Sequence, residues 1–211
     1  NRLESAASTP YQRRGSTFGG IMQQPVTRNK HLGLFTAQLL RRPWRIVALA
    51  PSSRALGDQM AAEIDLGGAV VELGAGTGKI TESILAAGVD EGDLVLLEMN
   101  AAFCKLLRQR FPRATVLDWN AQRVGEVELA NVRSVVSGLP LLSMPVAVQN
   151  NIVGGAFKLM QPGGAYVQFT YGPKPPVATP VREALGLTWE KRDKIWMNLP
   201  PARSYVFRKP A

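Results

Sequence analysis

The sequence contains a single cysteine, Cys104, and a single histidine, His31. One cysteine excludes an internal disulfide framework and a cysteine-rich metal site, and one histidine excludes a site built from several imidazole ligands. No apolar run approaches the roughly 20 residues that a helix needs to cross a bilayer. We therefore predict a globular domain that binds no metal, with Cys104 filling a small space in its core.

Acidic residues are also scarce, since 16 Asp and Glu stand against 25 Lys and Arg, for a net charge of +9. Residues 1–65 carry nine basic and four acidic side chains, and residues 165–211 carry eight and three. Residues 66–164 carry eight and nine, so the middle of the chain is nearly neutral. Two basic flanks indicate an anionic partner, either nucleic acid or an anionic membrane surface, unless they only keep the surface solvated.

A glycine-rich turn follows the first strongly apolar run of the chain. The β-branched run over 69–73 contains Glu72 and breaks into Gly74, Gly76 and Gly78, after which a helical pattern begins. Glycines let the backbone approach a ligand closely, and the free N–H groups at a helix start favour electron-rich groups. The spacing fits neither the dinucleotide fingerprint nor a P-loop. We therefore expect a different nucleotide-like cofactor at this turn.

A second acidic residue, Glu98, ends the next strand-like run, 94–98. It lies about twenty residues further on, where such folds place the carboxylate that binds a ribose. Together with Glu72 and the three glycines it resembles motifs I and II of the class I S-adenosylmethionine-dependent methyltransferases. The resemblance implies S-adenosylmethionine as cofactor and S-adenosylhomocysteine as product.

Three more residues are candidates for cofactor contact because they follow predicted strands at the same edge of the sheet. Met99 comes directly after Glu98 and would flank the adenine. Asp118 would accept a hydrogen bond from the adenine amino group, with Trp119 packed beside it. Ordinary loop capping is the alternative for Asp118 and Trp119.

The chain from residue 66 onward alternates strands and helices as a βαβ fold does. The resemblance to class I methyltransferases implies an α/β, Rossmann-like, seven-stranded and mostly parallel sheet. The last two strand-like segments have no helix between them and should pair as an antiparallel hairpin. We expect strands over 69–73, 94–98, 114–117, 133–137, 164–170, 187–197 and 202–208, and helices over 54–64, 78–87, 100–110 and 145–160, the last ending at Gly163-Gly164.

The N-terminal part of the chain has a different character. Residues 1–29 are poor in large apolar side chains and predict a flexible tail. Residues 30–42 repeat apolar side chains at helical spacing between basic ends and stop at Pro43, which predicts a short amphipathic helix. We therefore predict a helical segment over 30–65 that faces a membrane or substrate, followed by the cofactor-binding domain, 66–211. The apolar stripe would otherwise pack on the domain core.

The segment Ser137-Gly138-Leu139-Pro140-Leu141 follows the fourth predicted strand. It resembles the Asn-Leu-Pro-Tyr form of motif IV in methyltransferases that act on amino groups. The resemblance implies a loop whose carbonyls hold the protons of an amine and aim its lone pair. Ser137, Gly138 and Leu139 are therefore candidate catalytic residues, and Tyr171 is a candidate proton relay. Leu141 replaces the aromatic residue that would stack on a planar base, which argues against a base as substrate.

Three features together resemble the bacterial phospholipid N-methyltransferases of the Agrobacterium/Sinorhizobium type: the basic N-terminal helix, the Ala-Pro-Ser-Ser-Arg segment at 50–54, and the serine form of motif IV. The resemblance covers roughly residues 30–208. It implies stepwise methylation of phosphatidylethanolamine, through its mono- and dimethyl forms, to phosphatidylcholine. We expect a monomer, peripheral on the cytoplasmic face of the inner membrane, that binds anionic lipids and no nucleic acid. The candidate substrate- and membrane-facing residues are Phe35, Arg41, Arg42, Trp44 and Arg45.

Two other interpretations stay open. An RNA adenine N6-methyltransferase-like enzyme would share the strand-end motifs and fits the positive charge, although the aromatic residue of motif IV is missing. A non-catalytic module that binds membranes or nucleic acid would need only the fold, although the glycine turn is intact.

Overall fold

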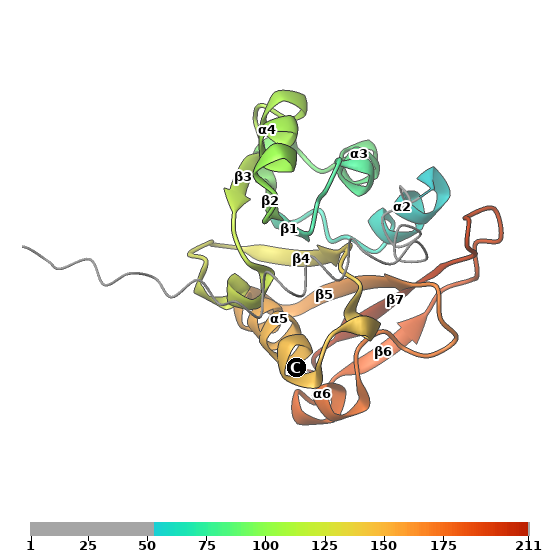
Figure 1. Cartoon of the computed structure of the whole chain (residues 1–211). Coiled ribbons are helices and arrows are strands. Elements are labelled where there is room, and N and C mark those ends of the chain that lie inside the picture. The colour runs from blue at the N-terminus through green and yellow to red at the C-terminus, as the bar shows by residue number, and fades with distance from the viewer. Residues whose placement is uncertain (1–52, 211) are drawn as a thin grey trace, which may run out of the picture. The chain divides into compact units, whose positions relative to one another are not determined.

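A seven-stranded sheet organises residues 53–210, the part of the chain that the computed structural model describes (Figure 1). Its strand order is β3-β2-β1-β4-β5-β7-β6, with β1 to β5 parallel and β7 antiparallel to both of its neighbours. The predicted mostly parallel sheet with a terminal antiparallel hairpin is confirmed. The strands are β1 (Ala69–Leu73), β2 (Leu94–Glu98), β3 (Thr115–Asp118), β4 (Val132–Ser137), β5 (Met160–Thr170), β6 (Thr188–Lys191) and β7 (Arg203–Arg208).

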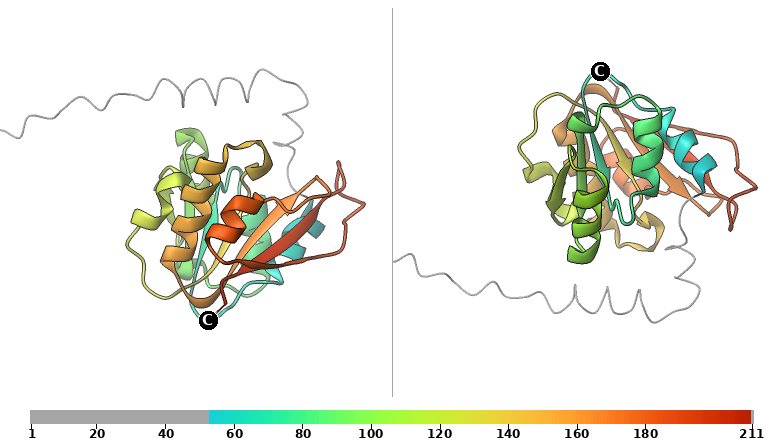
Figure 2. Two further views of the ribbon diagram at one scale, coloured as in Figure 1. Left: turned by 90° about the horizontal axis from the view of Figure 1, so that it is seen from below. Right: turned by 90° about the horizontal axis from the view of Figure 1, so that it is seen from above.

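Helices cover both faces of this sheet (Figures 1 and 2). On one face α2, α3 and α4 bury Leu56, Ile84 and Leu107 in one apolar cluster, and on the other α5 buries Ile152 in a second cluster. Within the described range, no helix has the length and apolar character needed to traverse a membrane. The helices are α2 (Arg54–Ala61), α3 (Lys79–Ala86), α4 (Ala101–Arg110), α5 (Val146–Leu159) and α6 (Thr179–Ala184), with short 3-10 helices η2 (Glu91–Asp93), η3 (Ala121–Glu126) and η4 (Leu141–Ser143).

The start of α2 and the burial of Cys104 agree with local signals in the sequence. Ser53 caps α2, because its side chain accepts a hydrogen bond from the Leu56 N–H at 3.3 Å. The helix stops at Ala61, three residues before the predicted end. Cys104 is 1% exposed and belongs to the apolar cluster, so the prediction of a core cysteine is confirmed.

The predicted end of the long helix at Gly163-Gly164 is wrong. α5 stops at Leu159, and β5 begins at once at Met160, so this strand is longer than the predicted 164–170. Gly163 has a φ of +80° inside β5, where the register against β4 shifts. The glycines therefore allow an irregularity within a strand instead of capping a helix.

The terminal hairpin is antiparallel as predicted, but β6 ends at Lys191 instead of residue 197. The next residue, Arg192, still donates its N–H to the Ser204 carbonyl of β7 at 2.9 Å, and its guanidinium contacts Glu63 of the segment after α2, with N···O distances of 2.6 and 2.7 Å. A single bridge between Ile195 and Ala202 then closes a loop of six residues. The short helix α6 was not predicted from the sequence.

The predictions for the N-terminal part of the chain lie outside the described residues. They concern the tail over 1–29, the amphipathic helix over 30–42 and the five candidate membrane-facing residues. Those residues are Phe35, Arg41, Arg42, Trp44 and Arg45, and their roles stay predictions.

Two glycines with nearly the same backbone conformation allow a test of the packing around the glycine turn. Gly78 has a φ of +81° and Gly163 one of +80°, but only at Gly78 would an added Cβ meet neighbours, 2.5 Å from a ring carbon of Phe111. We expect Gly163→Ala to lower the free energy of unfolding by about 1–2 kcal/mol, the cost of the left-handed backbone. Gly78→Ala should lower it by a further 1–3 kcal/mol or so. Urea unfolding of both variants measures the difference, and equal losses would show that the Phe111 ring moves aside freely.

Candidate active site

The carboxyl ends of the parallel strands bring the glycine turn and motif IV together. Gly74, Gly76 and Gly78 have φ values of +72°, +55° and +81°, which only glycine adopts without strain. The Gly74 N–H donates to the Leu97 carbonyl at 2.8 Å, which holds the turn against β2. A Cβ at Gly74 would lie 2.6 Å from a methyl carbon of Leu139. The turn therefore needs glycine both for its conformation and for the close approach of the motif IV loop.

Glu98, at the end of β2, is held by two backbone donors. One carboxylate oxygen accepts from the Gly76 N–H at 2.9 Å, and the other accepts from the Asn100 N–H at 2.8 Å. The side chain is only half-buried, and each oxygen keeps a further lone pair. Glu98 can therefore accept hydrogen bonds from ribose hydroxyls while it fixes the glycine turn.

Glu72, in β1, is fully buried. One carboxyl oxygen accepts from the Thr81 hydroxyl of α3 at 2.6 Å, and the other has no hydrogen-bond partner among residues 53–210. Burial raises the pKa of Glu72 to about 8, the Thr81 hydrogen bond opposes this rise, and the negative charge of Glu98 adds to it. A buried acceptor without a donor beside a glycine turn suits a ligand that carries an ammonium group.

The three remaining cofactor candidates lie beside Glu98. Asp118 is exposed and pairs in register with Glu98 across β2 and β3, and Met99 is 45% exposed. The Trp119 N–H donates to the Glu98 carbonyl at 3.1 Å, while its indole N–H donates to the Arg123 carbonyl at 3.0 Å. The Arg123 guanidinium covers the Trp119 ring, 4.6 Å from its centroid. Their contact with the cofactor stays a prediction, with Asp118 and Met99 accessible for it.

The hydrogen-bond acceptors at this edge of the sheet fit S-adenosylmethionine. The cofactor's amino acid part carries an ammonium group, which the unpartnered oxygen of Glu72 suits, and its ribose carries hydroxyls, which Glu98 suits. Gly74 and Gly76 keep part of their surface exposed, whereas Gly78 is buried beside Phe111. The assignment of these five residues to cofactor binding stays a prediction.

The motif IV loop is fixed by hydrogen bonds inside the fold. Ser137 is fully buried, and its hydroxyl accepts from the Leu139 N–H at 3.3 Å. The Gly138 N–H donates to the Leu73 carbonyl at 2.9 Å. The Leu139 carbonyl accepts from the buried side chain of Gln168 at 2.8 Å. Ser137 therefore holds the shape of the loop, and its catalytic role toward a substrate stays a prediction.

Gln168 is a site residue that the sequence analysis missed. It lies opposite Ser137 in the register of β4 and β5, and it is fully buried. Its amide also donates to the Phe169 carbonyl at 3.1 Å, and its oxygen accepts from the Tyr166 hydroxyl at 3.3 Å. The available signal was one amide among the mostly apolar residues 164–170, which implies a buried polar group with a specific partner.

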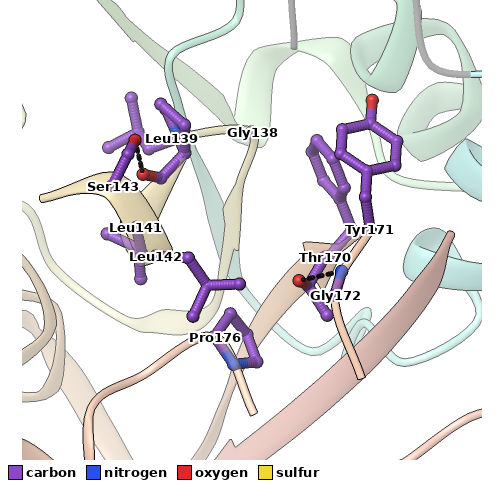
Figure 3. Close-up of a pocket in the computed structure, with 11 residues that line it drawn as sticks. Gly138, Leu139, Leu141, Leu142, Ser143, Thr170, Tyr171, Gly172 and Pro176 are labelled. Atoms are coloured by element: carbon purple, nitrogen blue, oxygen red, sulfur yellow. Dashed lines mark hydrogen bonds between the residues drawn. The ribbon is translucent and has the colours of Figure 1, made fainter. Parts of the chain in front are cut away.

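A pocket of about 140 Å³ opens between the motif IV loop and the end of β5 (Figure 3). Gly138 and Leu139 line it together with Tyr171, so the structure brings these predicted residues together, whereas Ser137 lies behind them. The Tyr171 ring packs edge to face on Phe169, with the centroids 5.3 Å apart. Apolar and aromatic walls remove water from a bound group and attract alkylammonium cations. The remaining lining residues are Pro140, Leu141, Leu142, Ser143, Phe169, Thr170, Gly172 and Pro176.

Asn198 connects this pocket to the loop between β6 and β7. It is buried, accepts from the Ser53 N–H at 2.9 Å and donates to the Pro200 carbonyl at 2.7 Å. Partial burial raises the pKa of the nearby Tyr171 phenol, and the Asn198 side chain opposes this rise. Nothing in the sequence around Asn198 indicated this role.

Among residues 53–210, no group of three His, Cys, Asp or Glu side chains is placed to hold a metal ion.

The sequence is similar to known methyltransferases. No family model matches it. It is 30% identical over 190 residues to the ornithine lipid N-methyltransferase of Singulisphaera acidiphila. The aligned region covers 85% of this chain and 96% of that protein. A structure solved for the conversion of a disulfide bond into a thioacetal group during echinomycin biosynthesis is 16% identical, with a TM-score of 0.60 over 84% of this chain and 92% of the other. An rRNA methylase from Streptococcus thermophilus is 12% identical, with a TM-score of 0.54 over 82% and 99%. The two solved structures share the fold.

The raised pKa of Glu72 predicts a dependence of stability on pH. The folded protein retains the Glu72 proton up to about pH 8, whereas the unfolded chain loses it near 4.5. The stabilisation is therefore complete below about pH 4.5 and is lost as the pH rises toward 8, at up to about 1.4 kcal/mol per pH unit. We expect Glu72→Gln to remove this slope in urea unfolding without cofactor between pH 6 and 9. Glu128→Gln, which neutralises an exposed glutamate, should keep the slope; loss of the slope in both variants would assign it elsewhere.

Glu98 allows a test of the cofactor site. Glu98→Gln keeps an oxygen for one backbone donor but removes the charge and one acceptor. We expect S-adenosylmethionine to bind at least tenfold more weakly by calorimetry, because a hydrogen bond to a charged group contributes about 1.5–3 kcal/mol. Circular dichroism should show that the fold is retained. An unchanged affinity would remove Glu98 from the site.

Proposed function

Because this chain belongs to the family of class I S-adenosylmethionine-dependent methyltransferases that includes the ornithine lipid N-methyltransferase of Singulisphaera acidiphila, we propose that it methylates the amino group of a membrane lipid. The observation that carries this proposal is the similarity to that lipid N-methyltransferase over almost its whole length. The pocket beside motif IV supports it, because apolar and aromatic walls suit an amine that becomes an alkylammonium ion.

We propose phosphatidylethanolamine and its mono- and dimethyl derivatives as the substrates and phosphatidylcholine as the final product. The motif IV loop and the serine at its start favour this choice. Ornithine lipid is the second candidate, because the relative's name gives that substrate. Both lipids present an amine at the membrane surface, so the pocket chemistry suits either.

The cofactor supplies a methyl group that is activated on a positively charged sulfur. The chain's own task is to present an amine without its extra proton, because only a free lone pair can accept a methyl group. Desolvation in the pocket between Leu139 and Tyr171 favours the neutral amine. Tyr171 is the candidate relay for the proton that leaves, because it lines the pocket beside the motif IV loop.

The carbonyls of the motif IV loop differ in whether they are free to accept a hydrogen bond from the substrate amine. Leu139 accepts from Gln168 and from the Leu141 N–H, and Pro140 accepts twice from Ser143. None of the hydrogen bonds within residues 53–210 uses the Gly138 carbonyl, and Gly138 lines the pocket. We therefore assign the Gly138 carbonyl to hold a proton of the substrate amine, with Ser137 and Gln168 as positioning residues that fix the loop.

The membrane part of the proposal rests on the N-terminal segment. We propose that residues 30–65 face the cytoplasmic leaflet of the inner membrane, with basic and aromatic side chains at head-group depth. The enzyme would then be peripheral and act as a monomer. The residues assigned to this contact are Phe35, Arg41, Arg42, Trp44 and Arg45.

Lipid methylation can be tested directly. Radiolabelled S-adenosylmethionine is incubated with liposomes of an anionic lipid that contain either phosphatidylethanolamine or ornithine lipid, and the lipids are separated by chromatography. We expect label in mono-, di- and trimethylated phosphatidylethanolamine, and Glu98→Ala should give only background. Label in ornithine lipid alone would show that ornithine lipid, and not phosphatidylethanolamine, is the substrate. Label in added RNA and in neither lipid would refute lipid methylation.

A further inference from the structure

Three large apolar side chains project from the tip of the loop between β6 and β7. Trp196 is 73% exposed, Met197 is 90% exposed and Leu199 is 86% exposed. Single exposed apolar residues are common on soluble proteins, but a cluster of large ones within four residues marks an interaction site. We call residues 196–201 the apolar loop.

The base of the apolar loop is firmly held. Gln59 of α2 donates to the Asp193 carbonyl at 2.9 Å and accepts from the Ser204 N–H and hydroxyl at 3.0 and 2.8 Å. Arg192 forms its two short contacts with Glu63 just before the loop. The fold therefore presents the apolar tip on a fixed support instead of leaving it free to fold back.

The apolar loop lies at the same edge of the sheet as the pocket. β7 is antiparallel to β5 and pairs Arg203 with Thr170, so the chain that leads into β7 comes from the carboxyl edge of β5. Tyr171 follows Thr170 and lines the pocket, and Asn198 of the loop lies close enough to affect the pKa of the Tyr171 hydroxyl. Figures 1 and 2 show the loop projecting beyond the sheet next to β7. A surface that contacts the tip would therefore lie next to the entrance of the pocket.

Three basic residues lie in the segments on either side of the apolar loop. Lys191, Lys194 and Arg203 form no ion pair with any acidic side chain of residues 53–210. The Lys194 ammonium lies over the Trp196 ring, 4.3 Å from its centroid. The exposed aromatic and aliphatic side chains beside these cations match the acyl boundary and the phosphate layer of an anionic leaflet, and Asp193 is the one exposed carboxylate without an ion pair in the same segment, within residues 53–210.

We propose that the apolar loop inserts into an anionic lipid bilayer and fixes the pocket at head-group depth. This inference rests on the proposed function, because it names the surface on which a lipid-methylating enzyme must work. It adds a second membrane contact to the one proposed for residues 30–65, and it lies near the other end of the sequence. Trp196, Met197 and Leu199 enter the acyl boundary, while Lys191, Lys194 and Arg203 contact lipid phosphates.

The test measures binding of the full chain to vesicles of phosphatidylcholine and phosphatidylglycerol, without cofactor and without an amine-bearing lipid. The triple variant Trp196→Ser/Met197→Ser/Leu199→Ser should sediment with these vesicles at least tenfold more weakly than the unchanged chain. Met197→Ser alone should weaken binding severalfold. Its matched control is Leu66→Ser, which removes an apolar side chain that is 58% exposed before β1, at the opposite edge of the sheet.

The outcomes separate this inference from the proposed function. Weaker vesicle binding by the triple variant, with unchanged melting temperature and cofactor affinity, supports insertion even if no lipid is methylated. Vesicle binding equal to that of the unchanged chain would overturn it. A lower melting temperature of the triple variant would also overturn it, because the loop would then pack on the chain's own residues. Equal losses for Met197→Ser and Leu66→Ser would likewise refute a specific role of the loop.

Discussion

The hydrogen bonds around Glu98 hold the candidate active site together. Its carboxylate accepts from Gly76 in the turn after β1 and from Asn100 at the start of α4. Its carbonyl accepts from the Trp119 N–H after β3 and from the Cys104 thiol of α4. One residue at the end of β2 therefore fixes three neighbouring segments of the sheet edge. The cofactor turn keeps its shape because these contacts need no ligand.

Glu72 behaves differently although it lies one strand away. Its burial favours the protonated form, and one of its oxygens has no partner within residues 53–210. A cationic ligand would stabilise the charged form, so occupancy of the site and the Glu72 proton are linked. Glu72 thus keeps a buried oxygen without a hydrogen-bond donor, which a bound cation can supply. Glu98, in contrast, fixes the segments around it. The two acids of the sequence motif have separate physical tasks.

Most of the sheet was predictable from the sequence because β-branched runs end in acidic or glycine residues. The edge that carries Glu72, Gly74 and Glu98 follows from strand ends alone, since parallel strands bring their carboxyl ends together. The Gly163-Gly164 pair misled the prediction, because a positive φ also serves an irregularity within β5.

The contacts that shape the pocket could not be predicted in the same way. Gln168 reaches Leu139 across 29 residues, and Asn198 reaches Ser53 across 145. Such contacts depend on which strands become neighbours, and no local pattern encodes that. Ser137 illustrates the limit most clearly. Its position in the motif was evident from the sequence. That its hydroxyl points inward and accepts from the Leu139 N–H was not.

The terminal hairpin explains why an apolar loop can reach the active edge at all. In a parallel sheet, only the segments that follow strands lie at the carboxyl edge, and here those segments already carry the candidate cofactor and substrate residues. β7 runs the other way, so the segment that precedes it lies at that edge too. The fold thereby gains one more loop beside the pocket without altering the catalytic segments. An apolar tip on that loop can contact a membrane while Gly138 and Tyr171 stay fixed within the pocket.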